Sequence, residues 1–183
     1  MNSNDLTISN VVGGGDLKRE IDLSKIYEDI EISNVEYEPE QFPGLILRFQ
    51  NPKATVMLFT SGKYNIAGSK SYSDARDAAE KFISIIESIL GENIESRDFE
   101  IRFVVCTGDL GFELDLNKVM IGLGIEEVEY EPEQFPALFY RPEKEQWFAL
   151  LFRTGKIIIE GGPELEVLED GYNKIINKLD KDN

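Results

Sequence analysis

The chain has 183 residues, of which 35 are acidic, 19 are basic and none is histidine, so its formal net charge is −16. With 42% hydrophobic residues it can bury a core, and no apolar stretch approaches the roughly 20 residues of a membrane span. The missing histidines exclude Ser-His and Cys-His catalytic pairs and histidine-ligated metal sites, and a single cysteine, Cys106, excludes an internal disulfide.

One cysteine fits a reducing compartment, and the N-terminus has no signal-peptide h-region. We therefore expect a cytoplasmic protein with no membrane partner. Taken alone, the acidic charge argues against a nucleic-acid partner.

In chain order, a first strand is expected at Leu6–Val12 and a short helix near Asp22. Three strands follow, with turns at Asn51-Pro52 and Ser61-Gly62-Lys63. A long helix closes the segment, with Ser73 as its N-cap. The apolar residues of this helix recur at helical spacing, at Ala75, Ala79, Phe82, Ile86 and Ile89.

The second half of the chain predicts the same elements. A strand is expected at Phe99–Cys106, then a short helix near Asp115, three strands and a long helix. The apolar positions of that last helix are Leu168, Tyr172, Ile175 and Leu179. Each half therefore reads as an antiparallel sheet with helices on one face, and its other face is uncovered.

The sequence repeats itself without insertion or deletion. The nine residues Val35–Pro43 recur 93 residues later at Val128–Pro136, and Gly62-Lys63 recurs at the same offset as Gly155-Lys156. Two copies of so long a unit do not make a solenoid. We interpret the chain as two repeats, 1–93 and 94–183, related by pseudo-two-fold symmetry.

Strand side chains alternate between the two faces of a sheet, so the uncovered face can be assigned. In the first repeat it carries Asn10, Val12, Thr55, Met57, Asn65 and Ala67. In the second repeat it carries Phe103, Val105, Phe148, Leu150, Ile158 and Glu160. A large, mostly apolar exposed face usually marks a binding surface, although burial against a partner chain is an alternative.

The paired Glu-Gln-Phe-Pro segments, the paired Phe-x-x-Gly-Lys segments and the uninterrupted repeat resemble archaeal TATA-box-binding proteins. The resemblance implies an α+β saddle: a ten-stranded curved antiparallel sheet with four helices on its convex side. It also implies a transcription initiation factor, not an enzyme, that needs no cofactor and no metal. The concave side would bind double-stranded TATA-box promoter DNA through the minor groove and bend it. The protein would act in the nucleoid and recruit transcription factor B.

The resemblance also assigns residues. Minor-groove contacts would come from the twelve uncovered positions named above. Four phenylalanines would intercalate between base pairs, namely Phe42, Phe59, Phe135 and Phe152. Phosphates would be bound by Arg48, Lys63, Lys70, Arg141 and Lys156. Transcription factor B would be bound by the acidic loop residues Glu131, Glu133 and Gln134.

The sequence departs from the family pattern on the uncovered face. The partner of Asn10 in a symmetric asparagine pair is Phe103, and two central threonines are replaced by Ala67 and Glu160. A carboxylate about 6 Å from a phosphate costs roughly 3 kcal/mol at an effective dielectric near 20. A second hypothesis is therefore a divergent paralogue, weak in DNA binding, that regulates through protein–protein contacts.

Two further alternatives concern chemistry and assembly. An enzyme would have to rest on Glu131 and Glu133, which have no recognisable partner base. Because the two-fold symmetry lies within one chain, a monomer suffices, and a weak homodimer that hides the apolar face is the alternative.

Overall fold

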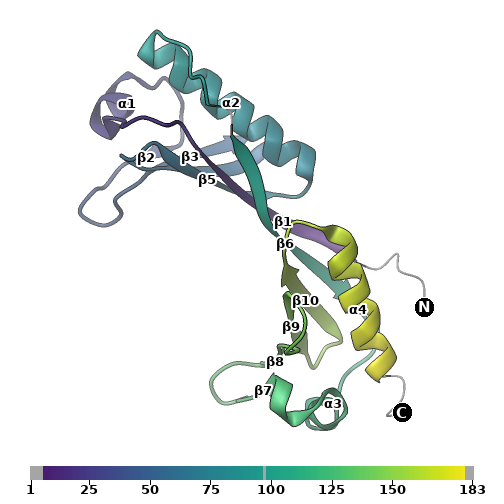
Figure 1. The fold of residues 1–183 in the computed structure, drawn as a ribbon. Coiled ribbons are helices and arrows are strands. Elements are labelled where there is room, and N and C mark those ends of the chain that lie inside the picture. Colours follow the sequence, from purple (N-terminus) through teal and green to yellow (C-terminus); the bar gives the residue numbers. More distant parts are fainter. Residues whose placement is uncertain (1–5, 97, 180–183) are drawn as a thin grey trace. The chain divides into compact units, whose positions relative to one another are not determined.

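The computed structural model describes residues 6–96 and 98–179, which form two compact units. The first unit spans residues 10–102, and the second contains residues 6–9 and 103–179. The repeat boundary expected after residue 93 stays a prediction. Figure 1 shows the elements of each unit. None of the helices in the described residues is long and apolar enough to cross a lipid bilayer.

The elements follow one another in the same order in both halves of the chain. The first seven are β1 (Thr7–Asp16), α1 (Leu23–Asp29), β2 (Val35–Glu36), β3 (Leu45–Gln50), β4 (Lys53–Leu58), β5 (Lys63–Ser69) and α2 (Tyr72–Leu90). The next are β6 (Phe99–Asp109), α3 (Leu116–Leu123), the 3-10 helix η2 (Ile125–Glu127), β7 (Val128–Glu129), β8 (Ala137–Tyr140), β9 (Trp147–Phe152), β10 (Lys156–Gly161) and α4 (Leu165–Leu179).

Each unit contains an antiparallel sheet covered by helices on one face. The strand order is β2-β3-β4-β5-β1 in the first unit and β7-β8-β9-β10-β6 in the second. Helix α2 packs on β4 and β5, and α4 packs on β9 and β10. The described residues thus form ten antiparallel strands and four α-helices, which confirms the expected α+β fold class.

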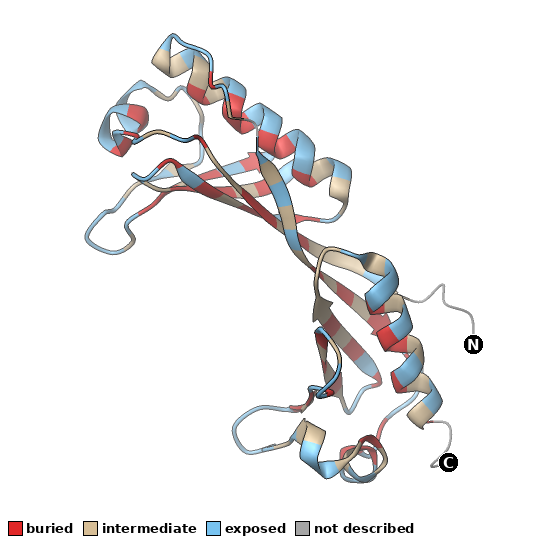
Figure 2. Cartoon of the chain, viewed as in Figure 1, coloured by how far each residue is buried: buried red, intermediate tan, exposed pale blue. Residues whose placement is uncertain are grey.

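The core of the first unit lies between α2 and its sheet. Val56 and Leu58 of β4 are fully buried, as are Phe82 and Ile86 of α2. Figure 2 shows buried residues gathered along one side of α2. The predicted apolar stripe is confirmed in α2, where only Ile89 is partly exposed, and in α4, whose four predicted residues are all buried.

Side chains cap the N-termini of α1, α2 and α3. Asp22 accepts hydrogen bonds from the backbone N–H groups of Ser24 and Lys25, and Asp115 caps α3 in the same way, at the two places where short helices were expected to begin. The prediction of Ser73 as the cap of α2 was wrong. Ser71, in an extended conformation, accepts a hydrogen bond from the Asp74 N–H at 3.0 Å, so the helix begins two residues earlier.

The first strand is longer than the sequence predicted. β1 continues through Gly13-Gly14-Gly15 to Asp16, with an irregularity in its pairing between Val11 and Gly13. The beginning of β6 lies against this segment, because a Cβ on Gly15 would stand 2.1 Å from the Asp98 carbonyl oxygen. The glycines therefore allow two backbones to approach closely within the first unit.

Candidate nucleic-acid interface

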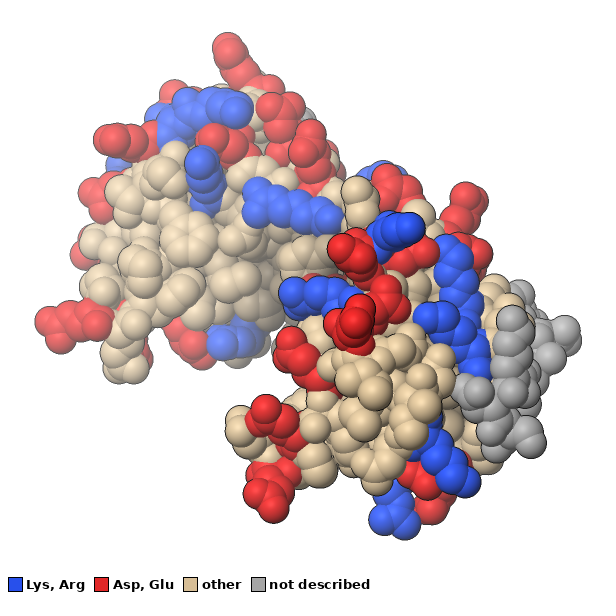
Figure 3. Space-filling view, turned by 60° about the horizontal axis from the view of Figure 1, so that its bottom comes forward, with Lys and Arg blue, Asp and Glu red and all other residues tan. Residues whose placement is uncertain are grey.

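The uncovered sheet face of the first unit brings together the residues predicted for it. Cross-strand pairing sets Thr55 opposite Ala67 and Met57 opposite Asn65. All four side chains are partly exposed, whereas Val56 and Ile66 between them are fully buried. Figure 3 shows a broad surface without charged groups on this unit, with Lys, Arg, Asp and Glu at its margins.

The same face of the second unit has different chemistry. Glu160 pairs with Phe148 on β9 and with Val105 on β6, and Ile158 pairs with Leu150. Phe148 also stacks on Phe139, with ring centroids 5.0 Å apart. This face therefore presents aromatic and aliphatic side chains around one carboxylate.

Glu160 is the one acidic residue predicted on this face, and it is partly buried. Desolvation by its surroundings raises the pKa of its carboxyl group above the usual range. Within residues 6–96 and 98–179, no cation pairs with it and no donor hydrogen-bonds to it. The carboxylate is thus left uncompensated by the described residues.

An edge-to-face phenylalanine pair lies at the end of each sheet face. Phe42 and Phe59 have ring centroids 5.8 Å apart at 64°, and Phe135 and Phe152 are 6.3 Å apart at 66°. The loop geometry also repeats, because the Phe42 N–H donates to the Glu38 carbonyl and the Phe135 N–H to the Glu131 carbonyl. Although Phe135 contacts Phe152, it is still 49% exposed, which leaves much of a large apolar side chain in water.

The predicted phosphate-binding cations differ in their surroundings. Lys63, Lys70 and Lys156 are exposed, and none of the three forms an ion pair within the described parts of the chain. Arg48 instead pairs with Glu36 at 2.6 Å, so part of its charge is already compensated. The Arg141 guanidinium lies 5.1 Å from the ring centre of Phe139 and 5.7 Å from that of Phe148.

Lys63 and Lys156 owe their equivalent positions to two tight turns. The preceding residues, Gly62 and Gly155, have φ of 82° and 87°. A Cβ on either would stand 2.1 or 2.2 Å from a backbone carbonyl oxygen. Only glycine fits both the conformation and the space, and the lysine that follows each turn is exposed.

Two asparagines of the first unit have oriented amide groups. The Asn10 Oδ1 accepts the Gly68 N–H at 2.7 Å. The Asn65 Oδ1 accepts from the Arg102 Nη1 at 2.9 Å. Because each oxygen is engaged, each NH₂ group is left to donate to an acceptor on a ligand.

Arg102 was not predicted as a site residue. It is the last residue of β6 that belongs to the first unit, and its Nη2 would stand 2.8 Å from a Cβ on Gly14. The position 93 residues earlier is Ser9, so the repeat pattern gave no hint of a cation here. Its guanidinium adds a positive donor group beside Asn65.

Residues 131–136 of the acidic loop between β7 and β8 are all exposed. Glu131, Glu133 and Gln134 all lie in it, and the Gln134 N–H donates to the Glu131 carbonyl at 2.9 Å. This turn holds the two carboxylates in a defined loop without engaging them in ion pairs within the described residues.

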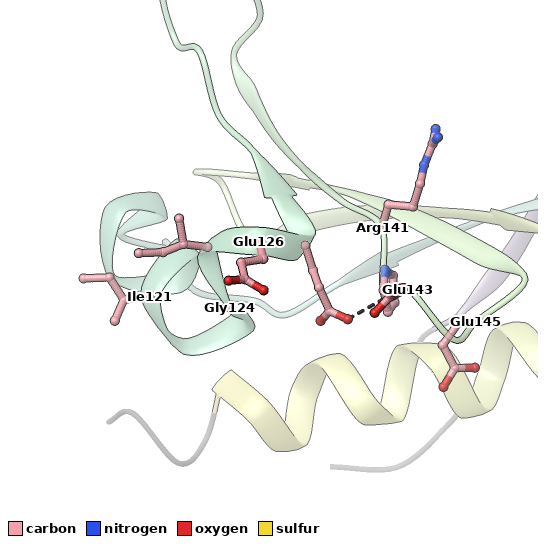
Figure 4. Close-up of a pocket in the computed structure, with 9 residues that line it drawn as sticks. Ile121, Gly124, Glu126, Arg141, Glu143 and Glu145 are labelled. Atoms are coloured by element: carbon pink, nitrogen blue, oxygen red, sulfur yellow. Dashed lines mark hydrogen bonds between the residues drawn. The ribbon is translucent and has the colours of Figure 1, made fainter.

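A separate acidic hollow lies beside α3 in the second unit (Figure 4). Its lining includes Glu127, whose carboxylate accepts the Glu143 N–H at 3.0 Å. Ile121 and Ile125 at its edge are 68% and 65% exposed. In the close-up, Arg141 extends away from the acidic side chains.

The described residues contain no group of three or more Cys, Asp or Glu side chains arranged to hold a metal ion. Burial raises the pKa of the Cys106 thiol to about 11, so this cysteine is not a thiolate near neutral pH.

Comparisons with known proteins cover nearly the whole chain. It is 40% identical over 174 residues to the TATA-box-binding protein of Archaeoglobus fulgidus, covering 95% of this chain and 94% of that protein. It is 38% identical over 176 residues to TATA-box-binding protein E of Halobacterium salinarum, covering 96% and 94%.

The solved structure of Methanococcus jannaschii TBP matches with a TM-score of 0.81 and 37% identity, covering 97% of this chain and 99% of that chain. A family profile described as "Transcription factor TFIID (or TATA-binding protein, TBP)" matches residues 5–89 and 98–181. These findings confirm the resemblance drawn from the repeated motifs. The chain therefore belongs to the transcription factor TFIID, or TATA-binding protein, family.

Proposed function

We propose that this protein is a transcription initiation factor that binds TATA-box promoter DNA through the minor groove, bends it and recruits transcription factor B. It would act in the nucleoid of an archaeal cell as a monomer or weak homodimer, without a cofactor. Its family and the names of its relatives support a role in transcription initiation.

The observation that carries this proposal is the phenylalanine pair at the end of each sheet face. An apolar ring inserted between base pairs replaces part of the stacking that is lost when the step opens. Half-exposed Phe135 is kept in place by the loop hydrogen bond of its own N–H, so the wedge is formed before DNA arrives. Preorganisation of this kind lowers the entropy lost on binding.

Cations beside each face would contact the phosphates. Each phosphate that is neutralised releases counterions, so five contacts from Arg48, Lys63, Lys70, Arg141 and Lys156 give a slope of about −4.5 in a plot of log K against log salt. The net charge of −16 acts at long range, whereas these residues act locally.

Transcription factor B would be bound by the exposed loop that carries Glu131, Glu133 and Gln134. Two carboxylates on a defined turn favour a basic patch on the partner through charge complementarity. The acidic hollow beside α3 adds negative charge to the same unit.

The test compares a TATA-box duplex with a scrambled duplex across a salt series, with and without transcription factor B. Binding is measured by fluorescence anisotropy, and bending by energy transfer between dyes at the two duplex ends. Selective binding and bending by the protein alone supports the proposal. Equal affinity for both duplexes, with no change in energy transfer, refutes it.

The second candidate is a divergent paralogue that binds transcription factor B and regulates initiation without selective DNA binding. The uncompensated, partly buried carboxylate of Glu160 favours it, because that group repels phosphates and minor-groove acceptors. Binding of transcription factor B with no preference for the TATA-box duplex would support this candidate over the first.

A further inference from the structure

Glu160 lies on the uncovered sheet face of the second unit, between two apolar neighbours across the strands. Phe148 faces it from β9 and Val105 from β6. No described residue donates to its carboxyl oxygens. A partly buried acceptor with no partner in the protein is costly, unless a ligand supplies the missing donor.

Base pairs differ in what they offer such a group in the minor groove. A·T pairs present only acceptors there, at adenine N3 and thymine O2, whereas a G·C pair adds the guanine N2 amino donor. A carboxylate is repelled by the first set and accepts a hydrogen bond from the second. The apolar side chains around Glu160 strengthen that bond by excluding water.

We propose that Glu160 selects a G·C base pair at one position of the promoter that the second unit covers. The inference rests on the proposed minor-groove binding. It makes Glu160 a specificity-determining residue and not only a source of repulsion.

The first unit presents the opposite chemistry. The amide oxygens of Asn10 and Asn65 are already engaged, no described residue accepts from either NH₂ group, and Arg102 adds a guanidinium. Donors of this kind suit the acceptors of A·T pairs. The residue 93 positions before Glu160 is Ala67, which can neither donate nor accept. The preferred site is therefore asymmetric: it is A·T-rich under the first unit and has a G·C pair at one position under the second.

The experiment measures affinity for duplexes in which each A·T pair of a TATA box is replaced in turn by G·C and by C·G. Each replacement is also made at its mirror-related position, because the box can be bound in either direction. The wild-type protein is compared with Glu160→Thr and Glu160→Gln. The matched control is Glu166→Gln, which removes the same charge from exposed Glu166 on α4, on the helix-covered side of this unit.

At one position, the wild-type protein should bind the G·C duplex more tightly than the A·T duplex. Glu160→Thr should prefer A·T there by about 5- to 150-fold. Glu160→Gln should bind both within a few-fold, because an amide both donates and accepts. Glu166→Gln should keep the wild-type pattern.

The same base preference in the wild-type protein and in Glu160→Thr would overturn this inference, even if the variant bound every duplex more tightly. That result would leave the proposed function standing. Absence of selective binding to any duplex by every protein would overturn the proposed function, and this inference with it.

Discussion

Phe135 offers the sharpest test, because it contributes little to the free protein and much to the proposed complex. Replacing a fully buried phenylalanine by alanine costs about 3–5 kcal/mol. Phe135 is 49% exposed, so we expect Phe135→Ala to lose only about 1–2 kcal/mol of folding free energy. For a chain of this size, that lowers the midpoint of thermal unfolding by roughly 2–8 °C.

The effect on DNA should be larger than the effect on folding. In minor-groove proteins, this family among them, a wedge offsets an unstacking cost of a few kcal/mol per base step. Phe135→Ala should therefore weaken TATA-box binding by about 30- to 150-fold and reduce the energy-transfer change that reports bending. The assays are thermal unfolding, anisotropy and energy transfer on the same preparations.

The matched control is Phe112→Ala, which removes a phenylalanine that is 37% exposed in the loop before α3. It should leave binding and bending unchanged. A Phe135→Ala protein that loses stability as expected, yet binds and bends DNA like the wild type, would refute intercalation by this side chain.

Three other predictions test separate parts of the surface. Arg102→Ala should weaken TATA-box binding by about 5- to 150-fold and make the salt dependence of binding shallower. The control, Arg153→Ala at an exposed turn of the second unit, should change neither quantity. An unaltered salt slope for Arg102→Ala would argue that its guanidinium does not reach DNA. Glu160→Gln should be more stable than the wild type at neutral pH, and the difference should vanish below the ordinary carboxyl pKa of 4.5. Because the folded wild type keeps this proton at pH values where the unfolded chain has lost it, wild-type stability falls as the pH rises from 4.5 through the raised pKa of the folded state. A difference in thermal unfolding that does not change with pH would contradict this. The double variant Glu131→Lys, Glu133→Lys should no longer retain transcription factor B in a pull-down, while its TATA-box affinity stays within a few-fold of the wild type. If the wild type and the double variant retain transcription factor B equally, the partner binds to another surface.

Much of the fold could be predicted from the sequence because each feature occurs in both repeats. The alternation in β4 and β5 assigned Thr55 and Ala67 to one face, and the cross-strand pairing bears this out. The helical spacing in α2 and α4 assigned the buried residues for the same reason. The spacing of apolar residues directly reflects which side of a helix or strand is buried, so the faces predicted from it agree with the structure.

What the sequence missed were features that depend on contacts between distant segments. Ser71 and Ser73 are equally good caps by residue type, and only the extended backbone of Ser71 decides between them. Arg102 joins the first unit through the beginning of β6, a placement that a 93-residue offset does not encode. The pairing of Arg48 with Glu36 likewise arises from strand register and not from motif spacing.

The roles of individual residues in binding DNA and transcription factor B stay predictions from the family resemblance. The structure supplies their geometry: paired rings, exposed lysines and an uncompensated carboxylate. Strand alternation assigned Glu160 and Phe148 to the same face, and the cross-strand pairing adds that they are direct neighbours although they lie 12 positions apart in sequence.

The three glycines of β1 also bear on how this face can evolve. A side chain at Gly14 would collide with Arg102 and Asn65, and one at Gly13 would stand 2.5 Å from the ring of Phe99. At this end of the first unit, substitutions are therefore confined to the residues whose side chains lie over the glycines, and the glycines themselves cannot change. Divergence of promoter preference within a lineage would pass through positions such as 65 and 102, while the backbone beneath them stays unchanged.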